Sequence, residues 1–161
     1  MRHRIARWLA VGLVGFALSV LASTAMVSTS SAGTDVDLRV SAYTNADAFA
    51  IGGGLLTDVG RSSHWFFNPN IDFAMGDTRD LMVLSGDFHY DFDTASSLSI
   101  WAGGGPALLY SNPDNGNSST DFGLNVLMGL GARTGGVRPF GQIRGTIADS
   151  NELALQGGIR F

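Results

Sequence analysis

Apolar and polar residues alternate along the last ten positions of the chain. One set of alternate positions is apolar or glycine: Leu153, Leu155, Gly157, Ile159 and Phe161. The other set, which holds the polar residues, is Glu152, Ala154, Gln156, Gly158 and Arg160. Successive side chains of a strand point to opposite faces, so this period of two predicts a strand with one apolar face.

The same alternation recurs upstream, in segments separated by clusters of Gly, Asn, Asp and Ser that are typical of turns. It predicts eight strands, over residues 35–43, 48–56, 64–75, 81–92, 98–110, 121–132, 137–148 and 152–161. Ten residues of a strand tilted by ~40° rise about 25 Å, which matches the apolar band of a transmembrane barrel. The fold class predicted is all-β, an eight-stranded antiparallel up-and-down transmembrane β-barrel.

One face of each predicted strand is nearly free of charge, and the other carries charged and amide side chains. The polar face includes Asp37, Arg39, Asp72, Asp87, His89, Asp91, Arg138, Gln142, Arg144, Gln156 and Arg160. Four of these residues are aspartates and four are arginines, so they can pair across a barrel. Because a buried charge needs a partner, we expect them to fill the interior as a polar network.

Alternation alone does not say which face points inward, and a soluble lipocalin-like barrel would carry its apolar face inside. Aromatic residues at the strand ends favour the opposite orientation, because a bilayer has two interfaces that select them. With a periplasmic N-terminus they form two girdles: Trp65, Phe67, Tyr90, Phe92 and Phe161 at the periplasmic rim, and Phe49, Tyr110 and Phe122 at the outer rim. The polar face also has few charges for a water-facing surface, and the chain has no lysine.

The first residues are typical of an export signal. Arg2, Arg4 and Arg7 precede an apolar stretch over residues 8–22, and small residues follow with possible cleavage after Ala25 or Ala32. The stretch is shorter than the ~20 residues of a spanning helix, which argues against an uncleaved anchor. We therefore predict a signal peptide and short spacer over residues 1–32, and the barrel over residues 33–161.

Charge narrows the range of partners. All fourteen acidic residues but only seven arginines follow Gly33, which gives that part of the chain a net charge of −7. An acidic chain without a basic patch argues against nucleic acid as a partner. The absence of cysteine excludes both a lipidated cysteine and stabilising disulfides.

Several runs resemble small outer-membrane β-barrel proteins of the OmpA/opacity-protein type: WFFNPNIDF, DFHYDF, IWAGGGPALLY, VRPFGQIR and LALQGGIRF. The resemblance covers residues 35–161. It implies a monomeric barrel in the outer membrane of Gram-negative bacteria, in contact with lipid and delivered by periplasmic chaperones to the barrel-assembly machinery. That machinery would recognise Leu153, Leu155, Ile159 and Phe161. Nothing follows the barrel that could match OmpA's peptidoglycan-binding domain, so the resemblance implies no tethering to the cell wall.

No catalytic, cofactor or metal site is predicted. Ser85 and His89 share a face with Asp87, but residues four apart on a strand are ~13 Å apart, too far for a nucleophile and its base. The acidic and amide run at residues 112–117 lacks the calcium-loop spacing, and the histidines lack ligands at metal spacing. The glycine runs lack the Lys-Ser/Thr of a phosphate loop. Such glycines would let the bulky inward residues Trp101, Phe140, Phe66 and Tyr43 pack over Gly52, Gly129 and Gly131.

Three functions stay open at this stage. The first is a non-enzymatic barrel with a structural or surface-interaction role, in contact with other molecules through its outer loops. The second is a narrow channel of low conductance, because the interior of eight strands is nearly filled by side chains. The third is a lipid-modifying barrel enzyme, for which no nucleophile–base pair is apparent. A soluble binding barrel is the alternative at the level of the fold.

Overall fold

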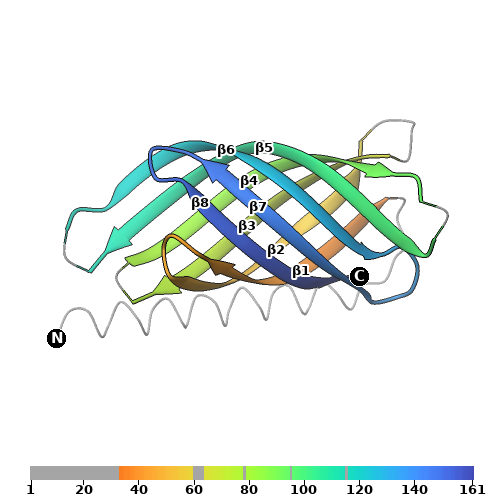
Figure 1. Cartoon of the computed structure of the whole chain (residues 1–161), viewed down its shortest axis with the longest axis horizontal. Helices are drawn as coiled ribbons and strands as arrows, with labels where there is room; N and C mark the ends of the chain where they lie inside the picture. Colours follow the sequence, from red (N-terminus) through yellow and green to blue (C-terminus); the bar gives the residue numbers. More distant parts are fainter. Residues whose placement is uncertain (1–32, 60–63, 78, 95, 115) are drawn as a thin grey trace. The chain divides into compact units, whose positions relative to one another are not determined.

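The computed structural model describes residues 33–59, 64–77, 79–94, 96–114 and 116–161. Within these ranges the chain forms eight strands: β1 (Thr34–Tyr43), β2 (Ala48–Asp58), β3 (Trp65–Gly76), β4 (Arg79–Phe92), β5 (Leu98–Pro113), β6 (Ser119–Ala132), β7 (Arg138–Ile147) and β8 (Glu152–Arg160). Each strand pairs antiparallel with the next, and β8 pairs back with β1 (Figure 1). The predicted eight-stranded antiparallel barrel is confirmed.

Two ends of the barrel are distinguished below. The terminal end is where β1 begins and β8 ends, on the right in Figure 1. The far end carries the turns β1–β2, β3–β4, β5–β6 and β7–β8. In the described ranges no helix has the length and apolar character needed to cross a membrane. The predicted signal peptide over residues 1–32 lies outside the described residues.

The β5–β6 hairpin departs from the prediction. The sequence predicts a long link over residues 111–120, yet Ser111 pairs with Ser119 and Tyr110 with Thr120, which leaves only residues 114–118 between the strands. Pairing continues through a stretch rich in turn-forming residues because each added pair satisfies backbone groups that would otherwise need water. The other connections at the far end are also short, so this end carries no long loop among the described residues.

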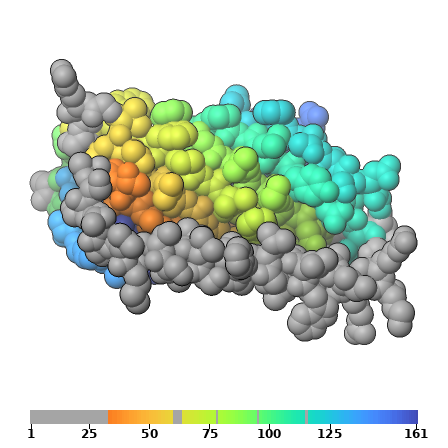
Figure 2. All heavy atoms as spheres, turned by 180° about the vertical axis from the view of Figure 1, so that it is seen from behind, coloured from red at the N-terminus to blue at the C-terminus, as the bar shows by residue number. Residues whose placement is uncertain are grey.

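The alternating pattern places the apolar face outside. Large apolar side chains are exposed on the outer wall of every strand from β1 to β8. Figure 2 shows one side of this wall, where β3 to β6 lie next to one another. Phe122 is 82% exposed, and Val126 in the middle of β6 is 60% exposed. A soluble protein rarely exposes so large a contiguous apolar surface, whereas a barrel in lipid requires one. This arrangement contradicts the soluble lipocalin-like alternative, in which the apolar face would be inside.

The interior has two zones. Its middle is polar, while the far end is filled by the far-end apolar cluster: Tyr43, Ala46, Ala48, Ala50, Ala74, Leu81, Val83, Ala107, Leu109 and Ala154. A smaller cluster of Trp101, Leu127 and Phe140 lies elsewhere in the interior. Side chains therefore close the far end of the barrel, as expected for eight strands.

Glycines make room for bulky interior side chains at some positions. A Cβ on Gly129 would lie 2.5 Å from the indole ring of Trp101, and one on Gly131 would lie 2.8 Å from Cβ of Phe140. The predicted packing of an aromatic residue over Gly52 is wrong: its neighbour is the Asp72 carboxylate. A carboxylate takes this position because Asp72 is the cross-strand partner of Gly52.

We expect Gly129→Ala to lower the free energy of unfolding by about 1–3 kcal/mol, because the buried indole of Trp101 cannot shift far enough to admit a methyl group. Gly141→Ala is the matched control, since the nearest atom to its Cβ would be 4.0 Å away. Urea unfolding of both variants in detergent micelles measures the difference. Equal midpoints for the two variants would contradict this account of the interior.

Candidate functional site

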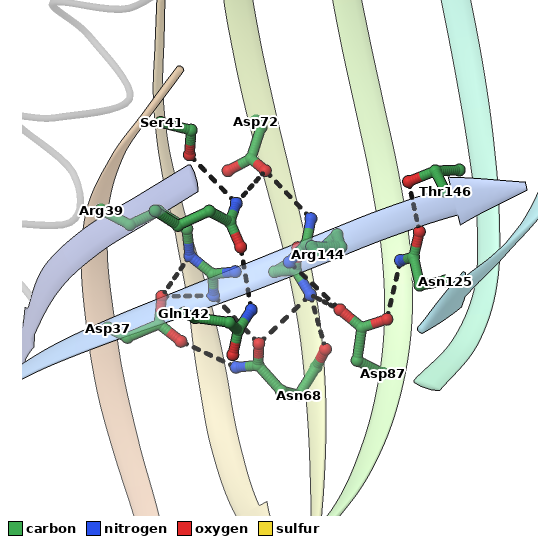
Figure 3. Close-up of polar contacts among 12 residues, drawn as sticks. Asp37, Arg39, Ser41, Asn68, Asp72, Asp87, Asn125, Gln142, Arg144 and Thr146 are labelled. Carbon is green, nitrogen blue, oxygen red and sulfur yellow. Dashed lines mark hydrogen bonds and ion pairs between the residues drawn. The ribbon is translucent and has the colours of Figure 1, made fainter. Parts of the chain in front are cut away.

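Arg144 on β7 is the centre of the polar interior. Its side chain is fully buried and forms ion pairs of 3.1 Å with Asp72 and 3.2 Å with Asp87. Figure 3 shows Arg144 with Asp72 and Asp87 on either side. Arg144 also donates a hydrogen bond of 3.0 Å to Asn70. One guanidinium therefore joins β7 to β3 and β4 across the barrel, with two carboxylates sharing its charge.

A second group lies between β1 and β3. Arg39 donates through Nε to Asp37 at 2.8 Å and through Nη2 to the Asn68 side chain at 2.9 Å. Asn68 in turn donates to Asp37 at 2.8 Å, so the three side chains form a closed ring of hydrogen bonds. The ring gives hydrogen-bond partners to both charged groups, Asp37 and Arg39. An ion pair needs such partners if its burial is not to cost much stability.

Amides and hydroxyls extend the network around the wall. Asp87 accepts from Asn70 at 3.0 Å and from Asn125 at 2.7 Å, and Thr146 donates to Asn125. On the other side, Asp72 accepts from Tyr43, Arg144 and Gln156. Further bonds run from Gln156 to Ser41, from Gln142 to Gln156 and from Trp101 to Gln142. All eight strands except β2 contribute a side chain to this network.

The predicted pairing of four aspartates with four arginines holds only in part. Asp37, Asp72 and Asp87 pair with Arg39 and Arg144, but Arg138 pairs with Asp35 instead, at 2.5 Å. Asp91 accepts a hydrogen bond from Ser99 at 2.5 Å and forms no ion pair with an arginine of the described ranges. Arg160 forms no ion pair among the described residues. Arg138, Asp91 and Arg160 do not join the Arg144 group because they lie near the terminal end of the barrel. The Arg144 group lies deeper along the barrel axis.

Aromatic rings surround Arg160 in place of a carboxylate. Its guanidinium carbon lies 4.3 Å from the ring centre of Trp101 and 4.6 Å from that of Phe140. Such cation–π contacts partly compensate the burial of a charge. His89 lies between Phe66 and Trp101, with ring centres 5.6 and 5.8 Å away.

The side chains that suggest acyl transfer are not brought together. Ser85 Oγ and His89 Nε2 are buried and make no hydrogen bond to the described residues. The Ser99 hydroxyl donates to the Asp91 carboxylate and not to an imidazole, so it lacks the histidine base of a serine nucleophile. Among the described residues no group of three His, Asp or Glu side chains is suited to hold a metal ion.

An ion pair that the sequence prediction missed lies at the far end. Arg79 at the start of β4 contacts Glu152 at the start of β8, and Glu152 also accepts from the backbone N–H of Ala46 at 3.1 Å. The predicted strand began at Leu81, which put Arg79 in a turn. Asn68 was missed as well, although its alternation with Asn70 and Asp72 places it on the same face.

The aromatic residues of the proposed girdles lie on the outer wall near the two rims. Trp65, Phe67, Tyr90, Phe92 and Phe161 lie at the terminal end, and Phe49, Tyr110 and Phe122 at the far end. Tyr90 contacts both Trp65 and Phe92, with ring centres 5.3 Å apart in each pair. Leu153, Leu155, Ile159 and Phe161 follow the outer side of β8 and its end, and all four are exposed.

Comparison with solved structures identifies the fold. The N-terminal β-barrel domain of Pseudomonas aeruginosa OprF matches with a TM-score of 0.65 and 16% sequence identity, over 80% of this chain and 97% of that domain. Neisserial surface protein A matches with a TM-score of 0.63 and 20% identity, over 79% and 94%. The outer membrane enzyme PagL matches with a TM-score of 0.51 and 16% identity, over 79% and 98%.

The chain has the fold of a small outer-membrane barrel. No protein-family model matches it, and no curated protein matches it in sequence. At these identities the likeness extends to the fold alone, because one barrel architecture carries unrelated functions. Function must therefore be argued from the interior and the surface.

Proposed function

We propose that the protein is a non-enzymatic barrel of the bacterial outer membrane with a structural or surface-interaction role. The observation that carries this proposal is the distribution of polarity: apolar side chains cover the outside, while a charged network is buried inside. Such a molecule is stable only where lipid covers its wall, and a closed barrel is one of two folds whose backbone can cross a bilayer. We also propose that it contacts outer-membrane lipids as a monomer.

A barrel whose interior is blocked by side chains is favoured over a narrow channel. The Arg144 group occupies the middle of the interior, and the far-end apolar cluster lies between it and the far rim. An ion that crossed this barrel would have to displace both a paired guanidinium and a packed apolar layer. The far-end turns are short, so a surface role would use the strand ends and rim residues in place of long loops.

The enzymatic alternative draws only on fold likeness to PagL. A hydrolase needs a nucleophile within hydrogen-bond reach of its base, and Ser99 faces a carboxylate while Ser85 has no hydrogen bond to the described residues. These contacts support a structural role for the interior.

Two measurements test this function. Unheated samples should migrate differently from boiled ones on a denaturing gel, and the protein should fractionate with outer membranes. Reconstituted in planar bilayers, it should give no sustained ion conductance. Steady single-channel steps from the wild-type protein would favour the channel instead, and recovery in the soluble periplasm would exclude a membrane barrel altogether.

We also propose that the outward residues of β8 direct assembly through the barrel-assembly machinery. Deleting Phe161 should reduce outer-membrane yield in cells severalfold, because the exposed terminal aromatic is lost from the surface offered for recognition. The same variant should still refold in detergent, with a urea midpoint that falls far less than the yield, because the deletion removes only two backbone hydrogen bonds, both to Val36. Phe161→Tyr, which keeps an aromatic ring, is the control and should retain the wild-type yield. An undiminished yield of the deletion variant at low expression would refute the assembly role.

A further inference from the structure

A pocket of about 280 Å³ opens inside the terminal end of the barrel. Three arginines and three aspartates line it together with apolar side chains, a histidine and a serine, and Arg138 and Arg160 are two of the arginines. Its volume is enough for a small organic molecule. The far-end apolar cluster fills the opposite end, so the two ends of the interior differ in chemistry.

Arg160 is the unusual member of this lining. Only 8% of the residue is exposed, and its side chain makes no hydrogen bond or ion pair within the described part of the chain. Its Nε is fully buried without a partner, and the faces of Trp101 and Phe140 hold the guanidinium in place. The guanidinium of Arg160 thus lines a pocket, and its N–H donors have no acceptor among the described residues.

The strand register raises the electrostatic cost of burying the Arg160 charge. Arg160 lies directly opposite Arg138 in the β7–β8 ladder, and like charges at such positions repel each other. On its other side Arg160 is opposite Asp37, but Asp37 already accepts from Arg39 and Asn68. An anion in the pocket would relieve the repulsion and supply the missing acceptors.

The other charges around the pocket define which anion fits. Asp35 pairs with Arg138, Asp93 lies 3.8 Å from His64, and Asp91 lies beside Ser99 and His89. Arg133 is exposed and donates to the backbone of Phe92. Because three carboxylates stand nearby, a second negative charge on the ligand would be repelled. Leu56, Phe66 and Ala132 offer an apolar wall for the rest of the molecule.

We propose that this pocket binds a small organic molecule with a single carboxylate, held by the guanidinium of Arg160 in a bidentate pair. Planar guanidinium and carboxylate groups match each other in two parallel hydrogen bonds, which are stronger than bonds between neutral groups. Arg138 contributes a second positive charge at the rim. This site is independent of the barrel's structural role, and its failure would leave that role untouched.

Titration of the ¹⁵N-labelled barrel in an uncharged maltoside detergent tests the site, at constant ionic strength. The probes are butyrate, acetate and inorganic phosphate, and the readout is the amide shifts of Ser99 and Ala132. We expect saturable shifts, tightest for butyrate and weakest for phosphate. Arg160→Gln should weaken butyrate binding at least tenfold, while Arg160→Lys, which keeps the charge but loses the planar fork, should fall between.

Two further variants separate binding from general damage. Asp35→Asn removes one carboxylate and frees Arg138, so it should tighten butyrate binding severalfold, a gain that misfolding cannot produce. Arg79→Gln at the far end is the control and should bind as the wild type does. Shifts that never saturate, or that are the same in wild type and Arg160→Gln, would overturn the proposal. Equal binding of butyrate and phosphate would overturn the assignment to a single carboxylate.

Discussion

Arg144→Ala is expected to lower the free energy of unfolding by about 3–5 kcal/mol. The substitution removes one guanidinium and leaves the carboxylates of Asp72 and Asp87 buried at 3.1 and 3.2 Å from an empty position. Tyr43 and Gln156 would still donate to Asp72, and Asn70 and Asn125 to Asp87, but none of them carries a charge. Urea unfolding in micelles, followed by intrinsic fluorescence, measures the loss.

Arg133→Ala is the matched control, because the Arg133 side chain is exposed and, within the described part of the chain, makes a single hydrogen bond, to a backbone carbonyl. It should change the unfolding free energy by about 0.5 kcal/mol or less. A triple variant, Arg144→Met with Asp72→Asn and Asp87→Asn, removes all three charges together and should recover much of the lost stability. If Arg144→Ala proves as stable as Arg133→Ala, the interior network does not hold the barrel together.

Val126→Arg is expected to destabilise the membrane-inserted barrel by about 2–4 kcal/mol. Val126 is 60% exposed at the middle of β6, where the outer wall would face the centre of the bilayer. Arginine there must desolvate its charge or distort the lipid around it. Unfolding from lipid vesicles by guanidinium, with the fluorescence of Trp65 and Trp101 as probe, gives the free energy directly.

Thr120→Arg tests the dependence on depth. Thr120 lies on the same outward side of β6 but beyond Phe122, where the girdle would meet water. Arginine near the interface should change stability by about 0–1 kcal/mol. The same effect at both positions would show that the outer wall does not face a membrane of the thickness that its strands imply.

Much of the barrel could be predicted because strand alternation is a local property. Each strand carries a charge-free face, and turn-forming clusters mark every connection, so eight strands and their order follow from the sequence. The closing contact between β1 and β8 also follows from an even number of strands with nonpolar outer faces. The length of the β5–β6 hairpin was underestimated, because composition indicates where a turn can form but does not indicate where strand pairing stops.

The far-end apolar cluster could not be predicted. Where consecutive residues are all apolar, the sequence does not show which of them point inward and which point outward. Residues 81–84 and 107–110 are continuous apolar runs, and the structure turns Leu81, Val83 and Leu109 inward. The interior pairing was equally out of reach. Which aspartate meets which arginine depends on the strand register and on depth along the axis, and neither can be read from one strand. Arg160 shows this, since its register partners are Asp37 and another arginine.

The direction in which the apolar face points is the central claim, and spin labels can test it directly. The chain has no cysteine, so Val126→Cys, Met128→Cys and Thr120→Cys can each be labelled without removing any native thiol. In lipid vesicles, labels at positions 126 and 128 should collide readily with oxygen and rarely with a water-soluble nickel complex, and the label at position 120 should do the reverse. If the nickel complex reaches positions 126 and 128 as readily as position 120, the apolar wall does not face lipid and the account is wrong.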